Sequence, residues 1–231
     1  MASESYKLLI DSTDAPPLEV LEEQVNKDEP KKLYIEGIFG QAGKINKNGR
    51  VYDLQEMIAD VERYDKEYIQ EARAFNELDH PDRPDLMSER VSDRTVKMSI
   101  DEKTGEVYGK ALVMPTPMGL IQKAFIESGG RLGKSSRAMG QLRESRDDNG
   151  RVCNYVTGLR LVCYDTVLDP SVSTAMVDPL LEKRDWIVNN EGGWMERPFD
   201  KLEKSISTLP RKNQEQYLVE CFKTFLKDIK M

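Results

Sequence analysis

The chain has 231 residues, of which 39% are hydrophobic and 32% are charged, and its formal net charge is −7. This composition suffices for one large folded domain, and the negative charge argues against a general nucleic-acid-binding surface. No apolar run is long enough to cross a bilayer, and the first residues lack the basic-then-apolar pattern of a secretion signal. Cys153, Cys163 and Cys221 have no zinc-ligand spacing, which indicates reduced thiols in a cytosolic compartment.

An acidic segment opens the chain. Residues 1–31 contain two consecutive prolines and no sustained apolar stripe, so we expect a mobile arm before the first domain. Alternating apolar residues then predict a strand over residues 32–41. Asp53 and Glu56 form a capping-box pattern in front of an amphipathic helix. An irregular loop follows, interrupted by prolines, and it holds His80, which is the only histidine of the chain.

A hairpin and a second helix are predicted next. Apolar residues alternate on both sides of a turn between residues 96 and 113, as in two antiparallel strands. A Pro-Thr-Pro sequence then starts a helix with Leu120, Ile121, Ala124 and Phe125 on its inward face, and two glycines end it. We therefore expect these four side chains to be buried.

Two long strands are predicted after this helix, over residues 131–142 and 151–168, joined by an Asp-Asp-Asn-Gly turn. The order of strands and helices indicates a mixed α+β domain built on an antiparallel sheet or barrel. The composition then changes, which sets the expected domain at residues 32–180. Residues 181–231 are expected to form a linker and a C-terminal helical segment, with apolar residues at helical spacing over residues 217–229.

His80 lies beside three acidic residues, Asp79, Asp82 and Asp85. Most single histidines stabilise a loop or lie on the surface, so this is the simplest interpretation. The acids could also form a metal site with the histidine, but the cluster lacks the spacing of helical or finger-type ligands. A third interpretation makes His80 a general base, and then it is the only imidazole available for that task.

Two further stretches could supply partners for such a base. Ser135 and Ser136 lie between glycines on a predicted strand, where small residues allow the close backbone approach that an oxyanion hole needs. A serine-rich edge strand would have the same pattern. Asp165 shares an inward strand face with apolar residues, so its carboxylate needs a buried partner. That partner is either an arginine, for which Arg131, Arg137 and Arg160 are all available, or His80, which would complete a Ser-His-Asp device.

Four stretches follow one another in a specific order. They are residues 33–52, with a strand and an Asn-Gly-Arg turn; Glu-Leu-Asp-His-Pro at residues 77–81; Gly-Lys-Ser-Ser-Arg-Ala-Met-Gly at residues 133–140; and residues 165–171, with Asp, Val, Pro and Ser at fixed spacing. Together they resemble the prohead core proteases of tailed phages, the T4-type serine peptidases. Any one motif is weak, whereas four in this order are specific. The resemblance covers residues 33–180.

The resemblance implies a role for each motif. His80 falls on the family's general base, and Ser135 falls on its nucleophile. Asp165 falls on the third member of the triad, with Asp169 and Glu77 as the alternatives. The implied α+β fold is similar to that of the herpesvirus assemblin protease, an antiparallel β-barrel ringed by helices, here with a C-terminal helical extension. No metal or other cofactor is implied.

The resemblance also implies how substrates are bound and cut. Ser136 and Arg137 sit where main-chain amides would form the oxyanion hole. Family cleavage falls after glutamate in Ile/Leu-x-Glu, so a cation is expected nearby, from Lys134 or Arg137. The implied substrates are scaffold (core) and major capsid proteins inside the phage prohead, which is assembled in the host cytoplasm. Self-cleavage is expected after Glu23 or Glu182; nucleic acid and membrane are not implied partners, and self-association stays open.

Two alternatives to the protease also stay open. The acidic arm and the C-terminal amphipathic helix would suit a non-catalytic scaffold or binding protein of the capsid interior. A cysteine-dependent hydrolase would use Cys163 or Cys153 with His80. Because Cys163 is predicted to be an inward core thiol, this last alternative is the weaker one.

Overall fold

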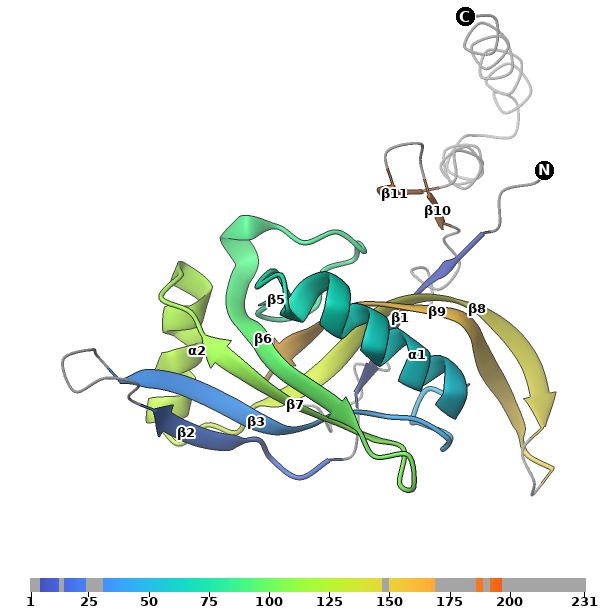
Figure 1. Ribbon diagram of the computed structural model, residues 1–231, viewed down its shortest axis with the longest axis horizontal. Helices are drawn as coiled ribbons and strands as arrows, with labels where there is room; N and C mark the ends of the chain where they lie inside the picture. Colours follow the sequence, from blue (N-terminus) through green and yellow to red (C-terminus); the bar gives the residue numbers. More distant parts are fainter. Residues whose placement is uncertain are drawn as a thin grey trace, which may run out of the picture. The chain divides into compact units, whose positions relative to one another are not determined.

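Two open β-sheets form most of the larger of the two units into which the chain divides, Tyr6–Lys183. The computed structural model describes residues 5–12, 15–23, 31–146, 150–168, 186–188 and 192–196. The five-stranded sheet (Figure 1) contains, in order, β2 (Glu19–Glu23), β3 (Lys32–Gln41), β7 (Glu106–Val113), β6 (Val91–Ile100) and β5 (Phe75–Glu77). The four-stranded sheet contains, in order, β1 (Lys7–Ser12), β8 (Gly133–Arg146), β9 (Val152–Val167) and β4 (Arg50–Tyr52). The helical elements are α1 (Leu54–Tyr64), the π-helical turn η1 (Asp65–Ile69), the 3₁₀ turn η2 (Ser88–Arg90) and α2 (Pro117–Glu127).

The first helix begins where the sequence predicts it. Asp53 caps α1 by accepting hydrogen bonds from the amides of Gln55 and Glu56 at 2.9 and 3.0 Å, which satisfies two donors that the helix itself leaves unpaired. The Glu56 side chain does not complete the capping box. It accepts instead from the amide of Leu159 on β9 at 3.2 Å, so the start of α1 is tied to the four-stranded sheet.

The second helix, α2, turns a different face to the sheet than the sequence predicts. Of the four side chains expected inward, Leu120, Ile121 and Ala124 are exposed, Leu120 by 57% and Ile121 by 42%, while Phe125 is half-buried. The buried residues of the helix are Gly119 and Gln122. A Cβ at Gly119 would lie 1.9 Å from the carbonyl oxygen of Met114, so only glycine lets the helix backbone come this close. The predicted inward face was wrong because close backbone packing at a glycine decides how this helix is rotated.

One apolar core joins the two sheets and α1. Its fully buried members come from β1, β3, β7, β8, β9 and α1, and they include Leu9, Ile35, Phe39, Tyr64, Val107, Ala111, Ala138 and Tyr164. Phe39 of one sheet meets Tyr164 of the other, with ring centroids 5.6 Å apart. Burying a large apolar side chain stabilises the fold by about 1.5–3 kcal/mol relative to leaving it exposed, so this shared core holds the sheets together.

The start of the chain differs from the prediction of a mobile arm over residues 1–31. β1 pairs with β8, and β2 pairs with β3, so two segments of the expected arm belong to the sheets. Leu8, Leu9 and Ile10 are buried, and the carboxylate of Asp11 lies 2.9 Å from Nη1 of the buried Arg50. The prediction failed at β1 because its apolar run is too short to show the alternation of a strand. Its pairing partner β8 also lies more than 120 residues away in the sequence.

The two sheets do not close into one barrel within the described residues, because the edge strands β2 and β4 pair with no further described strand. A parallel bridge between Leu78, just after β5, and Thr166 of β9 links the sheets. The amide of Asp79 donates to the carbonyl oxygen of Thr166 at 2.8 Å at the same point. The mixed α+β class is confirmed, and the expected β-barrel is corrected to two open sheets, with α1 against β6 and β9 and α2 against β6 and β7 (Figure 1).

The segment predicted as a linker contains a short antiparallel hairpin, β10 (Trp186–Val188) with β11 (Trp194–Glu196), which belongs to the second unit of the chain. The C-terminal helix predicted over residues 217–229 lies outside the described residues. None of the helices that the structure describes is both long and apolar enough to span a membrane.

Candidate active site

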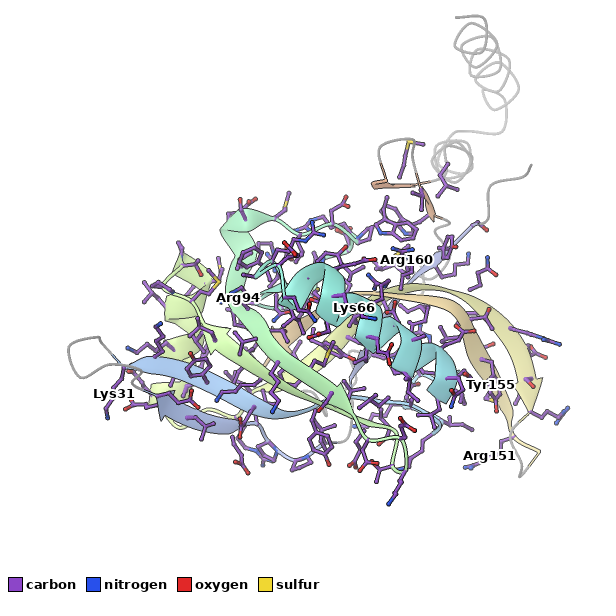
Figure 2. All side chains as sticks on the ribbon, in the orientation of Figure 1. Lys31, Lys66, Arg94, Arg151, Tyr155 and Arg160 are labelled. Atoms are coloured by element: carbon purple, nitrogen blue, oxygen red, sulfur yellow. The ribbon has the colours of Figure 1, made fainter. Side chains whose placement is uncertain are left out.

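Ser135 and Asp165 lie directly opposite each other on neighbouring strands. β8 and β9 form a long antiparallel ribbon, and the side chains of Arg151 and Tyr155 mark its turn end in Figure 2. Ser135 pairs with Asp165 close to the other end of this ribbon. Directly paired residues project from the same face of an antiparallel sheet, so the two side chains share a face. Arg137, two residues further along β8, lies on that face as well.

The loop after β5 brings His80 to this face from the other sheet. Leu78 pairs with Thr166, the neighbour of Asp165, and fixes the loop beside β9. Asp79 then adopts a left-handed backbone with a φ of 68°, which aspartate tolerates better than most residues, and its carboxylate accepts from the His80 amide at 2.9 Å. This turn directs the imidazole onto Asp165, with His80 Nδ1 2.9 Å from Asp165 Oδ2.

The Asp165 carboxylate is fully buried and is surrounded by donors. Besides Nδ1 of His80, it accepts from the main-chain amide of Glu77 at 3.0 Å, from Nη2 of Arg137 at 3.2 Å and from the thiol of Cys163 at 3.2 Å. Burial by itself raises the pKa of this carboxyl, but the His80 hydrogen bond and the Arg137 charge outweigh it and hold the pKa of Asp165 below its ordinary value. The ionised carboxylate accepts the Nδ1 proton, so the neutral imidazole presents an unprotonated Nε2.

Glu77, an acid close to His80 in sequence, has other partners. Its carboxylate is fully buried and accepts from the main-chain amide of Met87 at 2.5 Å. Three guanidinium groups lie 3.1–3.6 Å from it, those of Arg83, Arg90 and Arg137. Glu77 therefore balances arginine charge and anchors the loop that follows the histidine.

The carboxylate of Asp165 contacts the His80 ring. The Asp79 carboxylate is used on the His80 amide. No group of three or more histidine, cysteine, aspartate or glutamate side chains that could hold a metal ion occurs in the described ranges. Asp169, the remaining candidate for the third triad position, lies outside those ranges.

The hydrogen bond from Ser135 to His80 is not made in this structure. Nε2 of His80 is buried and has no hydrogen-bond partner within the part of the chain that the structure describes. Ser135 is fully buried on the same face as Asp165. Catalytic hydrogen bonds are often long in unliganded enzymes and tighten when substrate binds. The contact between Asp165 and His80 is therefore made, whereas a hydrogen bond between Ser135 and Nε2 of His80 is not.

Ser136 and Arg137 were predicted to provide main-chain amides for an oxyanion hole. At these residues β8 is paired on both sides, with β1 and with β9, so its amides face a neighbouring strand. The Ser136 side chain points to the opposite face from Ser135, where its Oγ donates to the carbonyl oxygen of Asp11 at 3.2 Å. There it lines a cavity of about 300 Å³ together with Asp11 and Tyr164.

Neither cation predicted to recognise a substrate glutamate is accessible. Lys134 is fully buried, and its Nζ donates to Asp93 at 2.6 Å and to the carbonyl oxygen of Tyr164 at 3.0 Å. Arg137 is also fully buried, and its guanidinium contacts Asp165. In this conformation both side chains hold protein elements together, so the structure brings neither of them to a substrate surface.

The described cysteines are buried thiols. Cys153 and Cys163 are both free and buried. Burial, followed by the charge of Asp165, raises the pKa of the Cys163 thiol well above its ordinary value. Because the thiolate is the nucleophilic form, this environment disfavours a cysteine-dependent hydrolase.

A family model described as the prohead core protein serine protease matches residues 9–185 of the chain. The chain belongs to this family. The prohead core protein protease of Enterobacteria phage T4 is 35% identical over 153 residues, which are 64% of this chain and 68% of that relative. The solved structure of the bacteriophage T4 capsid assembly protease matches with a TM-score of 0.63 and 28% identity, covering 71% of this chain and 99% of that one.

Membership of the prohead serine protease family confirms the resemblance drawn from the four sequence motifs. The matched range begins at residue 9, inside β1, so the strand taken for part of an arm belongs to the family region. The sequence analysis treated an arginine and His80 as alternative partners of Asp165, whereas the structure places both Arg137 and His80 against this carboxylate. It missed the arginine-binding role of Glu77. The available signal was an arginine two residues after the nucleophile candidate, on the same strand face, which needs buried acids as partners.

Proposed function

We propose that the chain is a serine endopeptidase of the phage prohead in which Ser135 is the nucleophile, His80 the general base and Asp165 the third member of the triad. The observation that carries this proposal is the 2.9 Å contact between His80 Nδ1 and Asp165 Oδ2, made on the strand face that Ser135 shares. The imidazole is unique in the chain, so no other histidine competes for the role of base.

The reaction follows from the chemistry of these groups. Nε2 of His80 takes the hydroxyl proton of Ser135 as Oγ attacks the scissile carbonyl carbon. Asp165 holds the ring in the Nδ1–H tautomer and stabilises the imidazolium that forms. The imidazolium then protonates the leaving amine, and water, activated by His80 in turn, hydrolyses the acyl-enzyme. General base catalysis of this kind contributes about 10²–10⁴-fold in rate.

The oxyanion is stabilised in this proposal by the main-chain amides of Ser136 and Arg137. Consecutive amides of a strand that is paired on both sides point to opposite neighbours, so one of these two amides faces β1 and the other faces β9. Both ladders therefore have to open locally before the two amides can face a substrate. The β1 ladder ends at this point, since Asp11 and Ser12 are the last residues of that strand. One such donor is worth about 2.7–4 kcal/mol in the transition state.

The proposed substrates are scaffold (core) and major capsid proteins of the immature head, cut after glutamate in Ile/Leu-x-Glu. Membership of the prohead protease family and the similarity to a capsid assembly protease support this substrate class. Cleavage takes place in the prohead interior, which is assembled in the bacterial host cytoplasm. Because Lys134 and Arg137 are buried, the cation that binds the substrate glutamate is another residue or becomes accessible in the active conformer.

Self-cleavage is proposed to favour Glu182 over Glu23. Glu23 is the last residue of β2, which is paired with β3, and its carboxylate binds Lys110. A protease needs an unpaired, extended segment, so this pairing opposes cleavage at Glu23. The border between the two units of the chain falls after Lys183, which is one residue beyond Glu182 in the sequence.

A peptide containing Leu-Ala-Glu, incubated with the purified full chain, tests the proposal. We expect cleavage after the glutamate and covalent labelling of Ser135 by a serine-reactive phosphonate, located by peptide mass spectrometry. Ser135→Ala should lower the rate of cleavage by about 10⁴-fold or more, because a triad acts as a unit, and should abolish labelling at this position, because the hydroxyl that bonds to the phosphonate is gone. Ser145→Ala is the matched control, since this serine lies on the exposed end of the same strand.

Intact masses of aged wild-type and Ser135→Ala protein test self-cleavage, with Glu182→Gln and Glu23→Gln separating the two sites. Identical masses in the wild type and in Ser135→Ala would reject self-cleavage. If the folded wild type neither cuts the peptide nor reacts with the phosphonate at a pH at which its ¹⁵N spectrum shows a neutral imidazole, the endopeptidase proposal fails. The non-catalytic scaffold protein of the capsid interior would then be the better interpretation.

A further inference from the structure

The guanidinium of Arg137 lies at the junction between the two sheets and is fully buried. On one side it faces Asp165, with Nε 3.0 Å from Oδ2 and Nη2 3.2 Å from Oδ1. This two-point contact fixes the plane of the carboxylate, which in turn sets the direction in which Oδ2 accepts from His80. The orientation of the imidazole therefore depends on the arginine through the acid.

On its other side the same guanidinium holds the loop that follows His80. Nη1 donates to the main-chain carbonyl oxygens of Arg83 and Asp85, both at 3.0 Å. These two residues follow the histidine by three and five positions, across two prolines. One planar group thus contacts the acid on β9 and the backbone of the loop that carries the base.

The buried charge is balanced at this junction. Glu77 lies 3.5 Å from Nη2 of Arg137, and its carboxylate also accepts from the amide of Met87, at the far end of the loop. Burial lowers the pKa of Arg137, but the neighbouring Cys163, Asp165 and Glu77 raise it, so the guanidinium stays charged. A buried arginine with two acids and two carbonyl oxygens around it has its donors in use, which leaves no role for this side chain in binding substrate here.

We propose that Arg137 is a positioning residue that couples the loop carrying His80 to Asp165, and so sets the geometry of the base. The inference rests on the proposed function. It assigns the side chain a task different from binding a substrate glutamate. The guanidinium contacts Asp165 and the carbonyl oxygens of the loop, and Arg137 acts on the base through these groups.

The two functions of the guanidinium can be separated by substitution. Arg137→Lys keeps a positive charge beside Asp165, but a lysine ammonium has no planar fork and cannot hold the acid and both loop carbonyls together. Arg137→Gln removes the charge as well. Arg143 provides the matched control, because it lies on the same strand with an exposed side chain, and Arg143→Lys and Arg143→Gln change the same chemistry away from the site.

The charge also affects how readily the histidine is protonated. The groups that face the imidazole or its partner are Asp165 and Cys163 from β9, Arg137 from β8 and Glu77 from β5, and the Asp79 carboxylate binds the main-chain amide of His80. Removing the arginine charge leaves the negative charge of Asp165 less compensated. Imidazolium is then favoured, so a higher pH is needed to form the neutral base.

The test measures phosphonate labelling against pH and records the ¹⁵N spectrum of the imidazole across the same range in the full chain. Because the chain has one histidine, every imidazole signal belongs to His80. Folded Arg137→Lys should label about 10–100-fold more slowly than wild type, since misplacement by about 1 Å can cost 10²-fold. The fall of its labelling rate on the acid side of the pH profile should occur at the same pH as in wild type. Arg137→Gln should label more slowly still, and both this fall and the titration of its imidazole should move to higher pH. Both Arg143 variants should match the wild type.

Two results would overturn the inference. One is a folded Arg137→Lys that labels within threefold of wild type. The other is an Arg137→Gln whose melting temperature falls while its imidazole titration curve stays in place, which is what a purely structural role predicts. If Arg137→Gln does not fold, the Arg137→Lys labelling rate decides alone. The imidazole spectrum can be recorded without turnover, so the two proposals can fail separately. If the wild type does not react with the phosphonate, the proposed function fails. If the imidazole titration of Arg137→Gln is the same as that of wild type, this inference fails.

Discussion

The Asp165 carboxylate receives donors from three strands and one loop, and this is why a buried acid can stay ionised there. His80 and Arg137 supply charge or hydrogen bonds to it, and Glu77 supplies a main-chain amide. Burial without such partners would push the carboxyl towards its neutral form, which would no longer favour imidazolium formation. The direction of the pKa shift at Asp165 therefore follows from its partners and not from its depth.

Asp165→Asn tests the role of this acid directly. An asparagine can donate to Nδ1, which favours the opposite tautomer of the neutral imidazole, with the proton on Nε2. We expect the ¹⁵N spectrum of the single histidine to show a change of tautomer, and phosphonate labelling to fall by about 10⁴-fold, as for the equivalent change in a known triad. Asp169→Asn should leave both readouts at the wild-type level. An unchanged tautomer in Asp165→Asn, or a loss of labelling in Asp169→Asn, would contradict the assignment.

The helix α2 shows how one backbone contact can override a side-chain pattern. Its apolar residues Leu120 and Ile121 repeat at a spacing that suggests burial, yet they face outward. The reason is Gly119, whose backbone lies against the carbonyl oxygens of Met114 and Ser92, where a Cβ would come within 1.9 and 2.6 Å. The spacing of apolar residues predicts which face of a helix is buried only when side chains make the contact with the neighbouring element. Here the helix backbone makes that contact.

Gly119→Ala should therefore destabilise the protein, against the usual trend. In an exposed helix interior, alanine is favoured over glycine by about 0.8–1.0 kcal/mol. Here the added methyl group meets carbonyl oxygens of the backbone, so we expect the free energy of unfolding to fall by about 1–3 kcal/mol. Leu120→Ala, which removes more atoms but from an exposed position, should change it by no more than about 0.5 kcal/mol. Urea unfolding of the three proteins measures this, and a more stable Gly119→Ala would disprove the packing argument.

Taken as a whole, the larger unit depends on contacts that cross between its sheets near the site. The bridge from Leu78 to Thr166, the contact of His80 with Asp165 and the shared apolar core all join strands distant in sequence. Charged and hydrogen-bonded groups at this junction make the stability of the whole fold sensitive to pH.

Acid unfolding tests this dependence. The pKa of Asp165 in the folded protein lies below the ordinary value of 3.8, so the ionised form stabilises the fold. This contribution is fully present above about pH 5 and is lost as the pH falls through the lower, folded pKa. The difference in unfolding free energy between wild type and Asp165→Asn should thus shrink as the pH falls from about 5 through the folded pKa of Asp165. A difference that grows over this acid range would show that the shift has the opposite sign.

The sequence by itself determined the strands over residues 32–41 and along β8 and β9, the cap at Asp53 and the four motifs that mark the family. These features depend on local period, on turn residues and on spacing, all of which can be read within about twenty residues. It also reduced the base to His80, because the chain has no other histidine.

Only the tertiary structure decided which acid meets His80, that β1 belongs to the sheet beside β8, and that α2 turns Leu120 and Ile121 outward. Asp165 lies 85 residues from the histidine, and Glu77 lies three residues from it, yet the distant acid makes the contact. The physical reason is that strand pairing and close backbone packing place groups according to which segments share a ladder. Distance along the chain does not determine that placement.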